Sequence, residues 1–135
     1  ETTQETIDSL ERVRQLFEAG CLQSAFWHRF AATAHAPIGQ RPELFGIRLH
    51  QEPRVTFARN ELPFHDPTGT DHETLGVGLR RALYNYMHGL GLDADVRTWF
   101  APGPGPGKDR KQKPKLPATT VKPDLVARAL AARRR

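Results

Sequence analysis

Cysteine is almost missing from this sequence, which holds a single one, Cys21. One thiol cannot form an internal disulfide, and it cannot supply the several thiolates that a cysteine-based zinc site or an iron–sulfur cluster requires. Disulfide scaffolds and cysteine-based metal proteins are therefore excluded for this chain on its own. A chain without disulfides fits a reducing compartment, and we expect it to be cytoplasmic.

Long apolar stretches are missing as well. No segment approaches the roughly 18 uninterrupted apolar residues that span a bilayer, so we predict no membrane helix and no membrane partner. The N-terminus is polar and acidic, without the basic start and apolar core of a signal peptide. The sequence begins at Glu1 rather than at a methionine, and we expect it to be a piece of a longer protein.

Lysine is absent from residues 1–100, and charge is unevenly distributed along the chain. Residues 1–100 hold 10 Arg against 13 Asp and Glu, which gives a net charge of −3. Residues 101–135 hold 5 Lys and 5 Arg against 2 Asp, which gives +8. The overall charge of +5 therefore comes from the C-terminal part, where any basic surface is expected.

Helical periodicity is clearest in two segments. Residues 6–19 repeat apolar side chains at three- and four-residue spacing and are followed by a terminating glycine. Residues 71–88 carry a stripe of leucines, although Gly76 and Gly78 weaken this helix by about 1 kcal/mol each, which suggests close contact with a neighbouring backbone. Further helices are predicted over 22–33, which carries Phe26, Trp27 and Phe30, and over 93–100 and 123–133.

One β-hairpin is predicted, because residues 46–50 and 54–58 alternate apolar and polar side chains on either side of a possible turn. The fold class is therefore a small, mainly helical α+β domain with one antiparallel hairpin, over residues 1–100. A Pro-, Gly- and Lys-rich linker over 101–117 is expected to be extended or disordered. A short basic amphipathic helix is expected within 118–135, and deletion of 101–135 is predicted to leave the body intact.

The stretch FHDPTGTDH, residues 64–72, has two interpretations. One is a metal or proton-transfer site, whose candidate residues are His65, Asp66, Asp71 and His72. The other is the start of a helix, in which Thr70 or Asp71 is the N-cap and Glu73 completes a capping box with Thr70. We favour the helix start, because neighbouring ligands rarely converge on a metal without a rigid backbone.

Two other features have a functional and a structural interpretation. His28 and His35 are seven residues apart and would share a face if the helix over 22–33 reached that far, but zinc helices use a four-residue spacing, so we interpret them as packed or hydrogen-bonded. The basic tail could bind nucleic acid by releasing counterions from phosphate. It lacks aromatic residues for base stacking, and a solvated linker with a basic helix explains the composition more simply.

Residues 26–49, FWHRFAATAHAPIGQRPELFGIRL, and 57–100, FARNELPFHDPTGTDHETLGVGLRRALYNYMHGLGLDADVRTWF, resemble the C-terminal region of radical S-adenosylmethionine proteins that have a cobalamin-binding-type N-terminal domain. The later stretch ATTVKPDLVARAL is similar too. Enzymes of this kind bind a four-iron–four-sulfur cluster through a CxxxCxxC motif on a partial barrel. They cleave S-adenosylmethionine there to an organic radical.

This chain departs from that pattern because Cys21 is its only cysteine. The resemblance therefore implies an accessory C-terminal region that holds no cofactor itself and is not catalytic alone. It would help to close or shape the active site of a barrel, which belongs to the same polypeptide or to a partner chain. That barrel would bind the iron–sulfur cluster and S-adenosylmethionine; whether it also uses cobalamin does not follow from the resemblance. The candidates nearest the substrate are His28, Arg29 and His35.

Two alternatives from other classes remain open at this point. The first is a stand-alone binding module whose basic tail contacts nucleic acid or an acidic partner. The second is a small metal-dependent enzyme built on the His-Asp loop. The substrate, the oligomeric state and the catalytic residues do not follow from the sequence.

Overall fold

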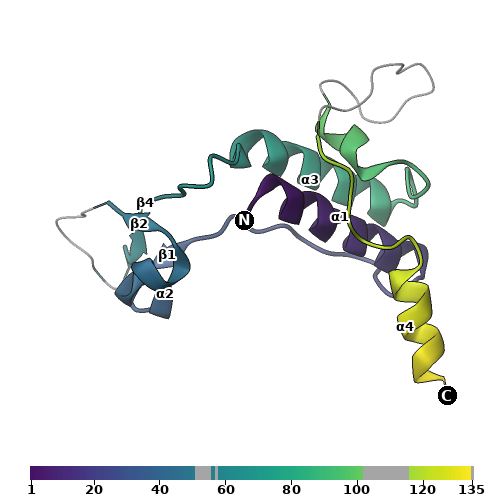
Figure 1. The fold of residues 1–135 in the computed structure, drawn as a ribbon, viewed down its shortest axis with the longest axis horizontal. Helices are drawn as coiled ribbons and strands as arrows, with labels where there is room; N and C mark the ends of the chain where they lie inside the picture. The colour runs from purple at the N-terminus through teal and green to yellow at the C-terminus, as the bar shows by residue number, and fades with distance from the viewer. Residues whose placement is uncertain (51–55, 57, 102–115, 135) are drawn as a thin grey trace. The chain divides into compact units, whose positions relative to one another are not determined.

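The computed structural model describes residues 1–50, 56, 58–101 and 116–134 (Figure 1). It is a mixed helix-and-sheet structure, which confirms the predicted α+β class. Its contacts divide the chain into unit 1, Glu1–Trp27 with Asp71–Arg135, and unit 2, His28–Thr70. This division differs from the expected body, linker and terminal helix, because the described end of the chain groups with the first helix.

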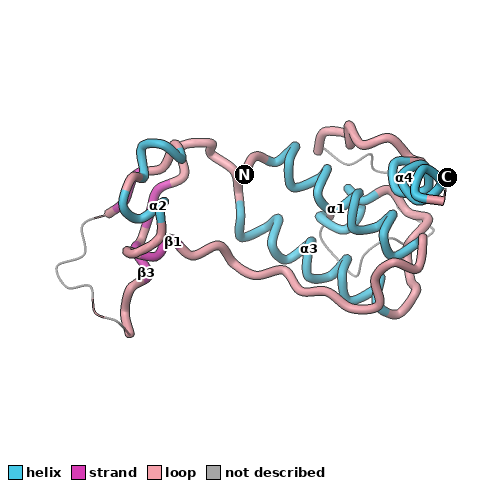
Figure 2. The backbone as a smooth tube through the Cα atoms, turned by 90° about the horizontal axis from the view of Figure 1, so that it is seen from below, coloured by secondary structure: helices cyan, strands magenta, loops and turns pink. Residues whose placement is uncertain are grey.

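Unit 1 is built on two helices that lie side by side, α1 (Thr3–Glu18) and α3 (His72–Met87) (Figures 1 and 2). A capping box opens α1: the Thr2 hydroxyl accepts from the Glu5 amide at 3.2 Å, and the Glu5 carboxylate accepts from the Thr2 amide at 2.7 Å. Both helices are followed by glycines in the left-handed region, Gly20 at φ +70° and Gly89 at φ +68°. The two most periodic segments therefore form helices close to the predicted positions.

The core of unit 1 lies where α1 and α3 meet the 3₁₀ helix η2 (Val96–Phe100). Its buried members are Ile7, Leu10, Phe17, Ala82, Leu83, Tyr86, Val96 and Trp99. Trp99 packs edge-on against Tyr86 and donates its indole N–H to the Tyr86 hydroxyl at 2.9 Å, so the buried N–H has a partner. The helix predicted over 93–100 is thus a shorter 3₁₀ helix, with Asp95 as its N-cap.

The C-terminal segment of unit 1 packs on α1. Residues 118–126 form hydrogen bonds with α1, Val121 is buried, and α4 (Leu125–Arg133) contacts α1 (Figure 1). Residues 102–115, which hold most of the predicted linker, lie outside the described residues. The contacts of 118–126 lead us to expect that deletion of 101–135 destabilises unit 1, in contrast to the sequence-based prediction.

Unit 2 consists of short elements. They are β1 (Ala32–Thr33), α2 (Pro37–Gln40), the 3₁₀ helix η1 (Pro42–Phe45), β2 (Arg48–Leu49), β3 (Glu61–Leu62) and β4 (Phe64–His65). β1 pairs with β3 and β2 with β4, both antiparallel. In the first pair Ala32 faces Leu62, and in the second Leu49 faces Phe64.

Two sequence predictions differ from this structure. The helix predicted over 22–33 is wrong: residues 22–31 have no helix, and β1 follows them. Ala25 and Trp27 pack towards the core of unit 1 while Phe26 between them is exposed, which is the two-residue alternation of an extended chain. Residues 48–49 do form a strand, but its partner is β4; the expected partner, 54–58, lies largely outside the described residues.

No helix in the described part of the chain combines the length and the apolar character that crossing a bilayer requires.

Candidate functional site

The stretch 64–72 forms a turn in unit 2 and a helix start in unit 1. In the turn, Asp66 Oδ1 accepts from the Thr68 amide at 2.9 Å, and the hydroxyls of Thr68 and Thr70 are 2.9 Å apart. Gly69 has φ +68°, a conformation that glycine adopts without a Cβ penalty. The contact of Asp66 is that of an Asx turn, in which the side-chain oxygen accepts from the backbone amide two residues later.

Asp71 is the N-cap of α3. Its Oδ1 accepts from the Thr74 amide at 3.1 Å, and the hydrogen bonds from Thr74 hold the pKa of the Asp71 carboxyl below its usual value. The capping interpretation therefore agrees with the structure at Asp71, whereas the capping box from Thr70 to Glu73 is not the arrangement found.

The metal interpretation of the same stretch finds no geometric support. Among the residues with described coordinates, no three or more His, Cys, Asp or Glu side chains are close enough together to hold a metal ion. His65 and His72 are both exposed. The hydrogen bonds at Asp66 and Asp71 account for the carboxylates as turn and cap.

The capping role predicts a specific order of stability. Asp71→Ala should lower the free energy of unfolding of unit 1 by about 1 kcal/mol, because the Thr74 amide loses its acceptor. His65→Ala and His72→Ala should change it by less than about 0.5 kcal/mol, since both side chains are exposed. Thermal melts of the three variants with and without zinc measure this. A zinc-dependent rise in melting temperature that disappears in both histidine variants would contradict it.

The substrate-proximal candidates His28, Arg29 and His35 are exposed side chains of unit 2. His28 and Arg29 precede β1, and His35 follows it, with its carbonyl accepting from Gln40 Nε2 at 3.3 Å. Because the helix predicted over 22–33 does not form, the condition under which His28 and His35 would share a helical face is not met. They are exposed polar groups of unit 2.

Unit 2 exposes large apolar side chains and buries almost none. Among its described residues only Ala32 is buried. Phe30, Leu44 and Phe45 are 54%, 65% and 50% exposed. Phe30 makes an edge-on contact with the ring of Phe64 at 5.5 Å, yet more than half of its surface stays accessible. We refer to Phe30, Leu44 and Phe45 as the exposed apolar set.

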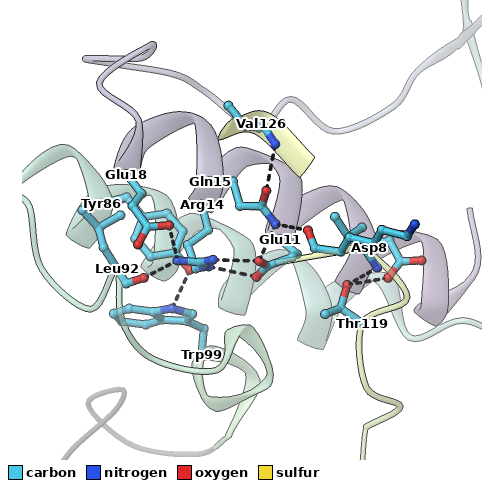
Figure 3. A network of polar contacts seen from close by, with 12 residues as sticks. Asp8, Glu11, Arg14, Gln15, Glu18, Tyr86, Leu92, Trp99, Thr119 and Val126 are labelled. Carbon is cyan, nitrogen blue, oxygen red and sulfur yellow. Dashed lines mark hydrogen bonds and ion pairs between the residues drawn. The ribbon is translucent and has the colours of Figure 1, made fainter. Parts of the chain in front are cut away.

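A polar network covers one side of α1, and it fixes the C-terminal segment (Figure 3). Asp8 is buried and accepts from the Thr119 hydroxyl at 2.7 Å and from the amide and hydroxyl of Thr120 at 2.8 and 2.6 Å. Gln15 donates to the Lys122 carbonyl at 2.8 Å and accepts from the Val126 amide at 3.1 Å. The buried side chains of Asp8 and Gln15 therefore fix residues 119–126, which lead into α4, on the surface of α1.

The same network continues through Arg14. Its guanidinium pairs with Glu11 at 2.8 Å and Glu18 at 3.0 Å, and it donates to the Leu92 carbonyl, which joins α1 to the chain after α3. The hydrogen bonds from Arg14 to Glu11 raise the pKa of Arg14, so it stays charged. The sequence analysis missed this network. A usable signal was the placement of Asp8, Glu11 and Gln15 at helical spacing beside an otherwise apolar helix.

Cys21 is exposed. A four-iron–four-sulfur cluster held through CxxxCxxC needs three cysteine thiolates, so this chain does not fit such a cluster, and no step of radical chemistry can be assigned to its residues.

Neither a family model, nor a curated protein, nor a solved structure matches this chain.

Proposed function

We propose that this chain is a C-terminal accessory region of a radical S-adenosylmethionine enzyme. In this proposal unit 2 packs against the barrel of the same polypeptide or of a partner chain, and helps to close or shape the active site. The sequence resemblance over residues 26–49 and 57–100 supports the assignment to this class. The observation that carries it is the exposed apolar set on a unit whose described residues bury only Ala32.

The physical argument concerns the stability of unit 2. Pairs of two-residue strands are marginal in water, and a unit with so little buried apolar surface gains little from its own packing. Covering Phe30, Leu44 and Phe45 with another surface contributes about 1.5 to 3 kcal/mol for each side chain that becomes fully buried. A larger domain packed against unit 2 provides that cover.

In this proposal the barrel and this chain have different roles. The barrel binds the cluster and S-adenosylmethionine, with cobalamin where the enzyme uses it, in the cytoplasm. This chain contributes Arg29 and His35, with His28 beside them, as exposed groups that can hydrogen-bond a polar or anionic substrate at the mouth of the barrel.

Hydrogen exchange tests this proposal. The gene is first read upstream of Glu1 for an in-frame CxxxCxxC motif, or a neighbouring gene is searched for one. Deuterium uptake is then measured for this chain alone and for the same chain bound or fused to the protein with that motif. We expect uptake in 28–70 to fall at least tenfold in rate in the assembled protein, because covered strands exchange more slowly.

A pair of variants sharpens the test. Leu44→Asp with Phe45→Asp should restore fast exchange in 28–70, because buried carboxylates oppose docking. Leu90→Asp, at a position 57% exposed in unit 1, is the matched control and should leave the protection unchanged. Equal protection of 28–70 with and without the barrel would reject docking through unit 2 and favour a stand-alone binding module.

A further inference from the structure

A hollow of about 380 Å³ lies in unit 1 where the C-terminal segment and α4 meet α1. Its lining residues are Arg12, Thr120, Val121, Lys122, Leu125 and Arg128. The volume falls within the range of small-ligand pockets. The lining combines residues that are more than a hundred positions apart in the sequence, so the hollow exists only when 118–126 is packed on α1.

The charge of this hollow has one sign. Arg12 and Lys122 are exposed, and their side chains make no hydrogen bond or ion pair with any residue that the structure describes. Arg128 reaches the carboxylate of Asp124 only at 3.9 Å, and both side chains are well exposed. Such a pair contributes little, so Arg128 is available to another anion.

The neighbouring acids are already engaged. Asp8 accepts hydrogen bonds from the hydroxyls of Thr119 and Thr120 and from the Thr120 amide. Glu11, next to Arg12 in the sequence, forms a two-bond pair with Arg14. The three cations of the hollow are thus left without a carboxylate of their own at ion-pair distance, apart from the long contact of Arg128.

We propose that this hollow binds the phosphates of a nucleic acid backbone. Arg12, Lys122 and Arg128 supply donors suited to phosphate oxygens, and the hydrogen bonds of Asp8 and Gln15 hold the tail cations beside α1 before the ligand arrives. Among the described residues that line the hollow there is no aromatic side chain, and Val121 and Leu125 carry no group that hydrogen-bonds a base edge. The binding is therefore to the backbone and independent of base sequence.

The distribution of charge favours a polyanion over a single phosphate. Arg133, in the last turn of α4, and Arg134, which follows it, continue the row of cations that begins at Arg128. A chain of phosphates can contact several of these cations at once and release a counterion at each. This inference concerns unit 1 and does not rest on the docking of unit 2.

Fluorescence anisotropy with a labelled 20-nucleotide oligouridylate, measured over a range of KCl concentrations, tests the proposal. The triple variant Arg12→Ala, Lys122→Ala, Arg128→Ala should weaken binding at least tenfold. It should also reduce the magnitude of the slope of log K against log salt by about 2, the value for three lost contacts to a single strand. The matched control is Arg41→Ala, Arg48→Ala, Arg59→Ala, which removes the same charge from exposed positions of unit 2. It should weaken binding by less than about threefold.

Further arms of the experiment separate the alternatives. Inorganic phosphate and AMP, tested as competitors, should displace the oligouridylate only at concentrations at least a hundredfold above its Kd. Polyglutamate of similar charge should bind at least tenfold more weakly than the RNA. Equal loss in both triple variants, competition by phosphate near the Kd of the RNA, or equal binding of polyglutamate would each overturn the proposal.

A last pair of measurements guards against loss of folding. The melting temperature of the hollow variant should lie within a few degrees of the parent, because the three side chains are exposed. Arg12→Lys with Arg128→Lys keeps the charge and should keep binding within about threefold. If this conservative variant binds as weakly as the triple alanine variant, the phosphate contacts are not the cause of the loss.

Discussion

Asp8→Ala is expected to destabilise unit 1 by about 2 to 3 kcal/mol. The substitution removes the acceptor for the Thr119 hydroxyl and for the amide and hydroxyl of Thr120, at 2.6 to 2.8 Å. Hydrogen bonds to a charged group contribute about 1.5 to 3 kcal/mol, and partly buried donors left without an acceptor add to the loss. Urea unfolding followed by tryptophan fluorescence, to which Trp27 and Trp99 of unit 1 both contribute, measures the change. Asp93→Ala, which removes an exposed acid of the same unit, should cost less than about 0.5 kcal/mol.

The same carboxyl predicts a pH dependence. Burial alone would raise the pKa of Asp8, but the hydrogen bonds from Thr120, Thr119 and Gln4 outweigh it and lower the pKa from 3.8 to about 2. A carboxyl with a lowered folded-state pKa stabilises the fold above its unfolded value, and that contribution is lost as the pH falls from about 4 to about 2. The difference in stability between the parent and Asp8→Asn should therefore shrink over this interval. A stability difference that stays constant down to pH 2 would show that the stabilisation by Asp8 does not come from its charge.

Gly78→Ala is expected to lower the stability of unit 1 by about 2 kcal/mol, although alanine is the better helix former. A Cβ at Gly78 would overlap the ring of Phe100, which packs against the core of the unit. Overpacking of this kind costs about 1 to 3 kcal/mol. Gly76→Ala, two residues earlier in α3, is the matched control. Its nearest neighbour is Arg80 Nη1 at 3.4 Å, the mobile end of a side chain, so it should stabilise by up to about 1 kcal/mol.

A double-mutant cycle identifies the contact. In the background of Phe100→Ala, the penalty of Gly78→Ala should disappear, because the ring that its Cβ meets is gone. Strict additivity of the two substitutions would reject the clash with Phe100. The sequence had suggested that both glycines mark a neighbouring backbone; the structure instead places an aromatic ring at Gly78 and open space with one arginine end at Gly76.

The parts of the fold that followed from the sequence are those with strong local signals. α1 and α3 have helical periodicity, acidic first turns and glycines after their ends, and these signals act within each helix. Residues 22–33 also show aromatic residues at helical spacing, but Trp27 packs against the core of unit 1 and Phe30 contacts Phe64 in unit 2. Tertiary packing thus overrides a weak local pattern there.

Pairing and the site depend on partners that are distant in the sequence. Nothing within residues 46–50 specifies β4 as the partner of β2. The donors for Asp8 on α1 come from Thr119 and Thr120, more than a hundred residues later in the sequence. The cap at Asp71 could be predicted because it is local, whereas the hollow beside Arg12 could not, since Lys122 and Arg128 reach it only through the fold.

The polar side of α1 also affects how the chain behaves while it is being synthesised. The ribosome completes α1 long before Val126, and at about 5 to 20 residues per second the intervening stretch takes roughly 5 to 20 s. During that time α3 and η2 can cover the apolar side of α1, while Asp8 and Gln15 still lack their hydrogen-bond donors from Thr120 and Val126. Until then, water can form hydrogen bonds with the carboxylate of Asp8 and the side-chain amide of Gln15. The nascent chain therefore exposes a polar face rather than an aggregation-prone apolar one until residues 119–126 are available to pack on α1.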